Sequence, residues 1–124
     1  LDTKILFSCS LTLLVIFVVP VLVYGFFVKF TSLEEPEKRL DFMLSVLIQK
    51  LGTTFGFVLL FFLARSYFTE RWLVYGLIWA VMFGIVEIGQ MIGSEYSKKE
   101  AAAGIISEFI YFPIAALIVA KLLT

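Results

Sequence analysis

A run of 24 residues without a single charge, from Ile5 to Val28, is the feature that most restricts the fold of this chain. An α-helix rises about 1.5 Å per residue, so the run spans about 36 Å, more than the roughly 30 Å of a bilayer's hydrocarbon core. The apolar part is too long for a secretory signal peptide, and no cleavage site of small residues follows it. The sequence therefore predicts a transmembrane helix, with a kink expected at Pro20.

Three further apolar runs of membrane-spanning length follow. The predicted spans cover residues 5–28, 42–64, 72–92 and 101–120, joined by the charged segments 31–41, 65–71 and 93–100. Only 16% of the residues are charged and 61% are hydrophobic, whereas soluble domains carry about 25% charged residues. We predict an all-α integral membrane protein, a single transmembrane domain over residues 1–124 that folds as a four-transmembrane-helix bundle with short loops. An even number of spans places both termini on the same side of the lipid bilayer.

The composition argues against several classes of protein. The net charge is zero and no basic tract is present, so nothing points to nucleic acid as a partner. The chain has no histidine and a single cysteine, Cys9, which excludes an internal disulfide, a cysteine-based metal site and histidine-based catalysis. We expect no cofactor, no metal site and no catalytic residues, and an enzyme is the function least supported.

The distribution of positive charge leaves the orientation open. Four cations are predicted on the side of the termini, and five on the other side, which we call side B because it carries the two larger loops, 31–41 and 93–100. The positive-inside rule selects no orientation from so small a difference. The expected location is a bacterial or archaeal cytoplasmic membrane.

Three of the predicted spans carry a charge well inside the membrane. Counted from the side B end of its span, Lys50 lies about 13 Å deep, Glu87 about 8 Å and Glu108 about 10 Å. Their similar depth predicts that the three charges share one layer of the bilayer. We expect a polar pocket open towards side B, formed by Gln49, Lys50, Glu87, Gln90, Glu108 and Tyr111.

Burying these charges is costly, so they need partners. A carboxylate in hydrocarbon costs about 3 kcal/mol on insertion scales, and pairing one glutamate with Lys50 would offset much of that cost. One lysine cannot neutralise two glutamates, so the second should hold a proton, water or a ligand. Two simpler interpretations compete with a functional pocket. The side chains could extend separately to the side B surface, or the cluster could serve only to lock the helices together.

Small residues indicate where helices approach one another. Two GxxxG pairs occur, and small-residue faces allow close helix packing in membranes. We expect helix packing at Gly52, Gly56, Gly84, Gly89, Gly93 and Gly104. Most of the 14 phenylalanines are expected to face lipid.

Three short motifs carry a resemblance to a known family. The segment Glu37–Phe42 has the spacing of Asp-Lys-x-x-His-Phe, with Lys38 in place, Glu37 for Asp and Asp41 for His. The segment Glu87–Gln90 matches Glu-x-x-Gln at the end of the third helix. Glu100 stands where an Asp opens the last helix. Gly104 and Ser107 replace the Asn and Gly that follow, and Lys98 or Lys99 stands for an Arg in the preceding loop.

The order of these motifs over residues 36–120 resembles the VanZ-like membrane proteins, named for a teicoplanin-resistance protein. The resemblance implies a four-helix core in a small bacterial envelope protein, linked to tolerance of glycopeptides or other amphiphiles. Only the motif formed by Glu87 and Gln90 matches in full, so no residue-by-residue mechanism follows from the resemblance.

Three functions remain open from the sequence. The first is a VanZ-like, non-enzymatic protein that binds or excludes an amphiphile, a glycopeptide or a lipid, at the polar pocket. The second is a small proton- or ion-coupled transporter or channel, in which a homo-oligomer lines a path with Lys50, Glu87 and Glu108. The third is an accessory subunit whose polar layer docks a helix of a membrane partner.

Overall fold

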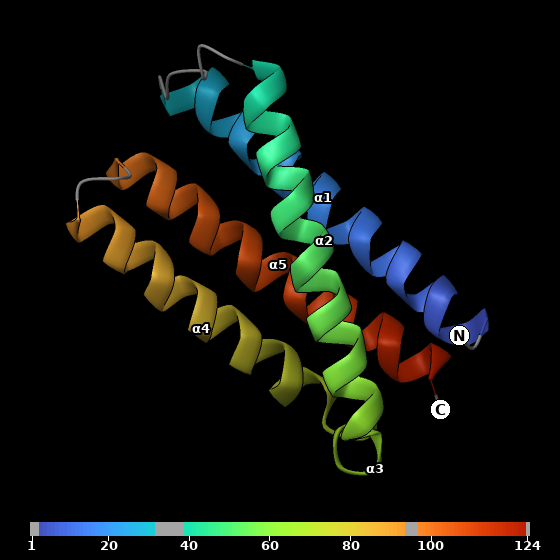
Figure 1. The fold of residues 1–124 in the computed structure, drawn as a ribbon. Helices are drawn as coiled ribbons and strands as arrows, with labels where there is room; N and C mark the ends of the chain where they lie inside the picture. The colour runs from blue at the N-terminus through green and yellow to red at the C-terminus, as the bar shows by residue number, and fades with distance from the viewer. Residues whose placement is uncertain (1–2, 32–38, 94–96, 124) are drawn as a thin grey trace.

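The computed structural model describes residues 3–31, 39–93 and 97–123, and every regular element in these ranges is a helix. The elements are α1 (Thr3–Thr31), α2 (Arg39–Leu63), α3 (Arg65–Phe68), α4 (Trp72–Ile92) and α5 (Lys98–Leu122) (Figure 1). All except the one-turn helix α3 are long and apolar enough to cross a bilayer. The predicted fold class is therefore confirmed, and the four apolar helices identify the chain as an integral membrane protein.

The long helices differ from the predicted spans mainly at their ends. The third span, 72–92, coincides with α4, whereas α1 and α5 extend beyond 5–28 and 101–120 and α2 begins earlier than 42 and ends at 63. The predictions covered the uncharged runs, but helices also continue through charged residues such as Lys29 and Lys98 at their ends. The segment 65–71, expected to be a loop, contains α3. α1 is helical on both sides of Pro20.

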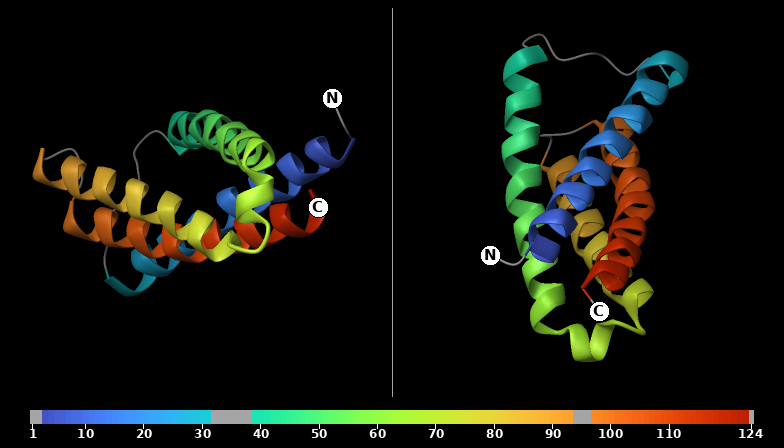
Figure 2. Two further views of the ribbon diagram at one scale, coloured as in Figure 1. Left: turned by 90° about the horizontal axis from the view of Figure 1, so that it is seen from below. Right: turned by 90° about the vertical axis from the view of Figure 1, so that its right-hand side faces the viewer.

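The last helix lies at the centre of the bundle. Helix α5 packs along both α4 and α1, and half of its apolar window is buried, a larger share than in any other span. Helix α2 packs mainly against α1 and makes few contacts with α5. Figure 2 shows α2 standing apart from α4 and α5 where it begins, at the side B end, and approaching them at its other end.

Aromatic side chains fill the half of the bundle away from side B. Phe57 of α2 has its ring centroid 4.9 Å from that of Tyr75, 5.5 Å from that of Trp79 and 5.6 Å from that of Phe112. The Tyr75 hydroxyl donates a hydrogen bond to the Phe57 carbonyl oxygen. We call the group formed by Phe57, Phe61, Phe68, Tyr75, Trp79, Phe83 and Phe112 the aromatic cluster. The aromatic cluster joins α2, α3, α4 and α5. It was not predicted from the sequence, because most phenylalanines were expected to face lipid.

Helices α4 and α5 approach each other closely at Gly76. A Cβ atom added there would lie 2.9 Å from the Phe112 carbonyl oxygen and 2.9 Å from the Pro113 Cα atom, both on the α5 backbone. Only a residue without a side chain lets the two backbones pack this closely. The sequence analysis did not single out this glycine.

The predicted glycine contacts are only partly present. A Cβ atom added at Gly84 would lie 3.9 and 3.8 Å from the side chains of Ile105 and Phe109, and one added at Gly56 would lie 3.7 Å from the Trp79 ring. Nothing lies within 4 Å of a Cβ added at Gly52 or Gly89, and at Gly93 only its own helix is that close. Of the two GxxxG pairs, only Gly56 therefore lies against another helix in the described residues. Because α2 and α4 stand apart near side B, the faces carrying Gly52 and Gly89 are exposed.

Candidate functional site

A pocket of about 400 Å³ lies between the four long helices, in the half of the bundle nearer side B. All six residues that the sequence analysis assigned to a polar pocket line it. The lining residues are Phe17, Pro20, Val21 and Tyr24 from α1; Ser45, Val46, Gln49 and Lys50 from α2; Phe83, Val86, Glu87 and Gln90 from α4; and Glu100, Gly104, Ser107, Glu108 and Tyr111 from α5.

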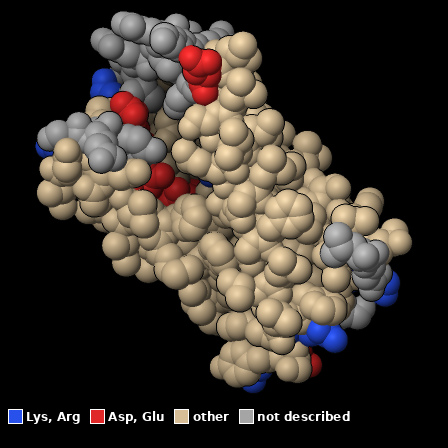
Figure 3. All heavy atoms as spheres, viewed as in Figure 1, with Lys and Arg blue, Asp and Glu red and all other residues tan. Residues whose placement is uncertain are grey.

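The pocket opens on a face of the bundle that runs along the helices. Figure 1 views the helices from the side, and Figure 3, from the same direction, shows acidic side chains at the bottom of a hollow between α2 and the pair α4 and α5. Val21 and Val86, which line the pocket, are exposed. A bilayer would surround this face, so the charged interior is reached past a rim that holds these apolar side chains and the exposed polar residues Ser45 and Gln49.

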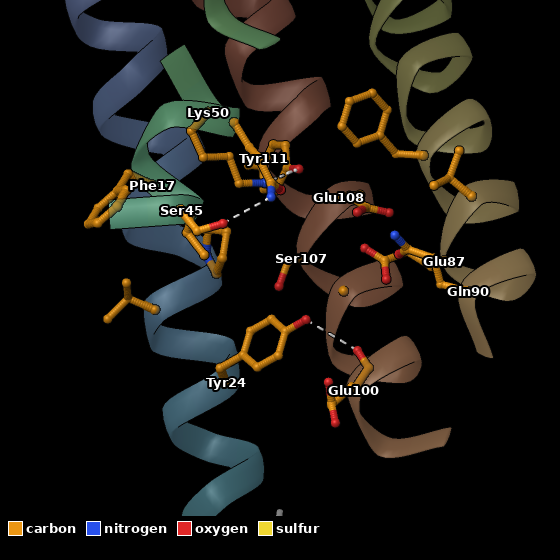
Figure 4. A pocket seen from close by; sticks show the side chains of 17 residues that line it. Phe17, Tyr24, Ser45, Lys50, Glu87, Gln90, Glu100, Ser107, Glu108 and Tyr111 are labelled. Atoms are coloured by element: carbon orange, nitrogen blue, oxygen red, sulfur yellow. Dashed lines mark hydrogen bonds between the residues drawn. The ribbon is translucent and has the colours of Figure 1, made fainter. Parts of the chain in front are cut away.

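Lys50 connects α2 to α5 across the pocket. Its ammonium donates a hydrogen bond of 2.9 Å to the Tyr111 hydroxyl and lies 4.7 Å from the centroid of the Tyr111 ring (Figure 4). Within the described ranges it makes no ion pair under 4 Å with Glu87 or Glu108. The predicted pairing of Lys50 with a glutamate is thus absent at ion-pair distance.

Glu87 and Glu108 meet between α4 and α5. Figure 4 shows their carboxyl groups side by side at the wall of the pocket. Glu108 is only 3% exposed. The two carboxyl groups lie within hydrogen-bond reach of each other. Apart from that contact, the buried oxygens Oε2 of Glu87 and Oε1 of Glu108 have no hydrogen-bond partner among the described residues. A buried acceptor without a donor is costly, so these carboxyl oxygens call for a proton or a donor from outside the chain.

Gly104 makes the meeting of the two glutamates possible. A Cβ atom added at Gly104 would lie 2.6 Å from Oε1, 2.7 Å from Cδ and 2.9 Å from Oε2 of Glu87. The Glu87 carboxyl group therefore occupies the space that a side chain at this position would take. Gly104, which was expected only to allow helix packing, therefore also determines where the Glu87 carboxyl group lies in the pocket.

The first turn of α5 forms the side B end of the pocket. Ser97 caps this helix, accepting a hydrogen bond of 3.1 Å from the Glu100 amide, as residues of its type do at helix starts. The Tyr24 hydroxyl of α1 donates a hydrogen bond of 3.3 Å to the Glu100 carbonyl oxygen. Sequence reasoning placed Glu100 in a loop motif and missed Tyr24, although Tyr24 is the only tyrosine of the first span.

The remaining predicted residues take peripheral positions. Gln49 is exposed at the rim and donates a hydrogen bond of 3.3 Å to Ser45 of its own helix. Gln90 is half-buried and lines the pocket. Asp41 is exposed near the start of α2 and does not line the pocket. The motif residues Glu37 and Lys38 lie outside the described residues.

Chemically, the site combines several carboxylate acceptors with one ammonium donor inside a partly open cavity. In the described part of the chain, no three histidine, cysteine or acidic side chains gather closely enough to hold a metal ion. The one cysteine, Cys9, is free, half-buried and does not line the pocket. The arrangement is suited to binding a polar group that enters from the membrane.

No protein-family model, curated protein or solved structure matches this chain. The resemblance to the VanZ-like proteins therefore stays a prediction.

Proposed function

We propose that this chain is a non-enzymatic membrane protein that binds the polar headgroup of an amphiphile in the pocket between its four helices. The observation that carries the proposal is the pair of unpartnered carboxyl oxygens, on Glu87 and Glu108, inside a cavity that opens towards the bilayer. The cavity volume of about 400 Å³ falls in the range of small-molecule sites, about 300–1,000 Å³. The headgroup of a membrane-dissolved molecule would enter while its apolar chain stays in lipid.

The VanZ-like resemblance supports the same proposal from the sequence. It implies a small bacterial envelope protein and links it to tolerance of glycopeptides or other amphiphiles. The even number of spans supports a location of both termini on one side of a bacterial or archaeal cytoplasmic membrane. Glu87 and Gln90, which form the one motif that matches without substitution, both line the pocket.

Blocking the pocket tests this proposal. Ser45 is exposed and lines the pocket from α2, so Ser45→Trp should fill its opening without removing a charge. Ile48→Trp is the matched control, because Ile48 is 68% exposed on the same helix and does not line the pocket. The proteins are purified with a total bacterial phospholipid extract and analysed by native mass spectrometry after detergent exchange.

We expect the wild type and Ile48→Trp to retain a bound amphiphile and Ser45→Trp to lose it. Cells that express the first two proteins should also survive glycopeptide or detergent stress better than cells that express Ser45→Trp. Equal retention by all three proteins, or none by the wild type, would contradict the proposal.

A second candidate, an ion- or proton-coupled transporter, is favoured by a different observation. The buried hydroxyls of Ser8, Thr12 and Thr54 have no hydrogen-bond partner among the described residues. Thr54 lies one helical turn beyond Lys50, away from side B, and Ser8 lies one turn from Thr12. These hydroxyls would extend the polar path across the membrane. Ion flux into liposomes that Glu87→Gln abolishes would favour this candidate over amphiphile binding alone.

A further inference from the structure

We infer that the pocket selects a zwitterionic headgroup, with a primary ammonium held between Glu87 and Glu108 and an anionic group held by Lys50. The inference rests on the proposed function and names the chemical class of the amphiphile. It follows from how donors and acceptors are distributed over the pocket walls.

The wall formed by α4 and α5 offers acceptors that lack donors. Glu108 is more than nine-tenths buried, and its Oε1 atom and the Oε2 atom of Glu87 are unpartnered within the described residues. A primary ammonium carries three donors and no acceptor, and its hydrogen bonds to carboxylates are among the strongest in proteins. One such group placed between the two carboxylates would satisfy both oxygens.

An organic cation fits this wall better than a metal ion. Hard cations such as Ca²⁺ take six to eight oxygen ligands, whereas no cluster of three ligating side chains exists in the part of the chain that the structure describes. A proton shared between the two carboxyl groups, which lie within hydrogen-bond reach of each other, would satisfy the same oxygens. The experiment below separates that outcome from the inference.

The wall formed by α2 offers the complementary charge. The Lys50 ammonium uses one donor on the Tyr111 hydroxyl, and within the described residues its hydrogen bonding ends there. Two donors are left for the oxygens of a phosphate or carboxylate. Because Lys50 makes no ion pair under 4 Å with either glutamate, positive and negative groups face the cavity from different helices. A headgroup that carries both charges matches this separation.

Lysophospholipids of one chain length provide the test, because they differ only in the headgroup. Lysophosphatidylethanolamine has a primary ammonium and a phosphate, lysophosphatidylcholine has a quaternary ammonium without N–H donors, and lysophosphatidylglycerol has no amine. Binding to the full chain in nanodiscs is measured by competition against a fluorescent analogue. We expect the ethanolamine headgroup to bind about 10-fold or more tightly than the glycerol headgroup, with choline between them.

Two variants locate the ammonium. Glu108→Gln removes one charge at constant shape and should abolish the preference for ethanolamine over glycerol. Gly104→Ala should weaken ethanolamine binding, because its Cβ atom displaces the Glu87 carboxyl group. Gly89→Ala is the matched control on α4, since no atom lies within 4 Å of the added Cβ, and it should bind like the wild type.

Failure of the inference can be distinguished from failure of the proposed function. If all three lysolipids bind equally and Ser45→Trp abolishes their binding, the pocket binds amphiphiles and the zwitterionic selection is refuted. The selection is also refuted if Glu108→Gln keeps the preference, because the ammonium would then bind elsewhere. If no lysolipid binds to the wild type, the inference fails, and the native mass spectra of the wild type and Ser45→Trp decide separately whether the pocket holds another amphiphile.

Discussion

The two halves of this bundle are built from the same helices, but one half is filled by packed aromatic rings and the other encloses a charged cavity. Away from side B, α2 meets α4 and α5 through the aromatic cluster, in which Phe57, Phe61 and Phe112 are fully buried. Towards side B, α2 stands apart and leaves a cavity lined by Lys50 and three glutamates. The first half supplies the packing that holds the helices together, and the second holds charges that packing alone does not require. Stability and binding should therefore respond to different substitutions.

The largest change in the free energy of unfolding is expected in the aromatic half. Phe57→Ala removes the ring that contacts Tyr75, Trp79 and Phe112, so it should lower the free energy of unfolding by about 2–4 kcal/mol through lost packing contacts. Unfolding in mixed micelles titrated with a denaturing detergent measures the change. The control is Phe55→Ala on the same helix, where the side chain is 50% exposed and little change is expected. Similar losses for both variants would show that the cluster does not dominate stability.

An intermediate effect is expected at the contact between α4 and α5. Gly76→Ala places a Cβ atom 2.9 Å from backbone atoms of α5, which cannot move as a side chain could, so the helices must separate. Overpacking of this kind costs about 1–3 kcal/mol. Gly89→Ala on the same helix meets no atom within 4 Å and should not destabilise the protein. If the same titration finds both variants equally stable, α4 and α5 do not approach each other at Gly76.

The smallest change in the free energy of unfolding is expected in the pocket, where a substitution should stabilise the protein. Glu108→Met replaces a buried carboxyl group by an apolar side chain of similar length, so it should raise the free energy of unfolding by about 1 kcal/mol while it abolishes amphiphile binding. Glu70→Met, at an exposed glutamate, should leave both properties unchanged. A loss of stability for Glu108→Met comparable to that of Phe57→Ala would mean that the charged cluster serves to lock the helices together.

The sequence was sufficient to predict the features that depend on position along one helix. The length of the uncharged runs gave the four spans, and counting residues from their ends placed Lys50, Glu87 and Glu108 at one depth. Side chains on different helices at one depth can meet if they face inward, and here they line one pocket. Depth alone could not show that Lys50 would contact Tyr111 rather than a glutamate.

Features that depend on how two helices cross could not be predicted in this way. A GxxxG pair marks a face that permits close approach, but the tilt of α2 decides whether another helix uses that face, and Gly52 and Gly89 are left exposed. Gly76 belongs to no GxxxG pair, only to the looser run of small residues Gly76, Ala80 and Gly84, yet a Cβ atom added there would meet the α5 backbone at 2.9 Å. Tyr24 was missed for the same reason, because its role depends on the side of α1 that meets α5.

The central position of α5 has a consequence for how the protein is made. Ribosomes synthesise this helix after α1, α2 and α4, so those three helices enter the membrane before the neighbour that α1 and α4 share is available. Until α5 is present, the Glu87 carboxyl group cannot pack against Gly104, and the aromatic rings of α2 and α4 cannot pack against Phe112. Assembly of the bundle is therefore a late event in biosynthesis, and nascent chains that stop before residue 98 would leave a carboxyl group facing lipid.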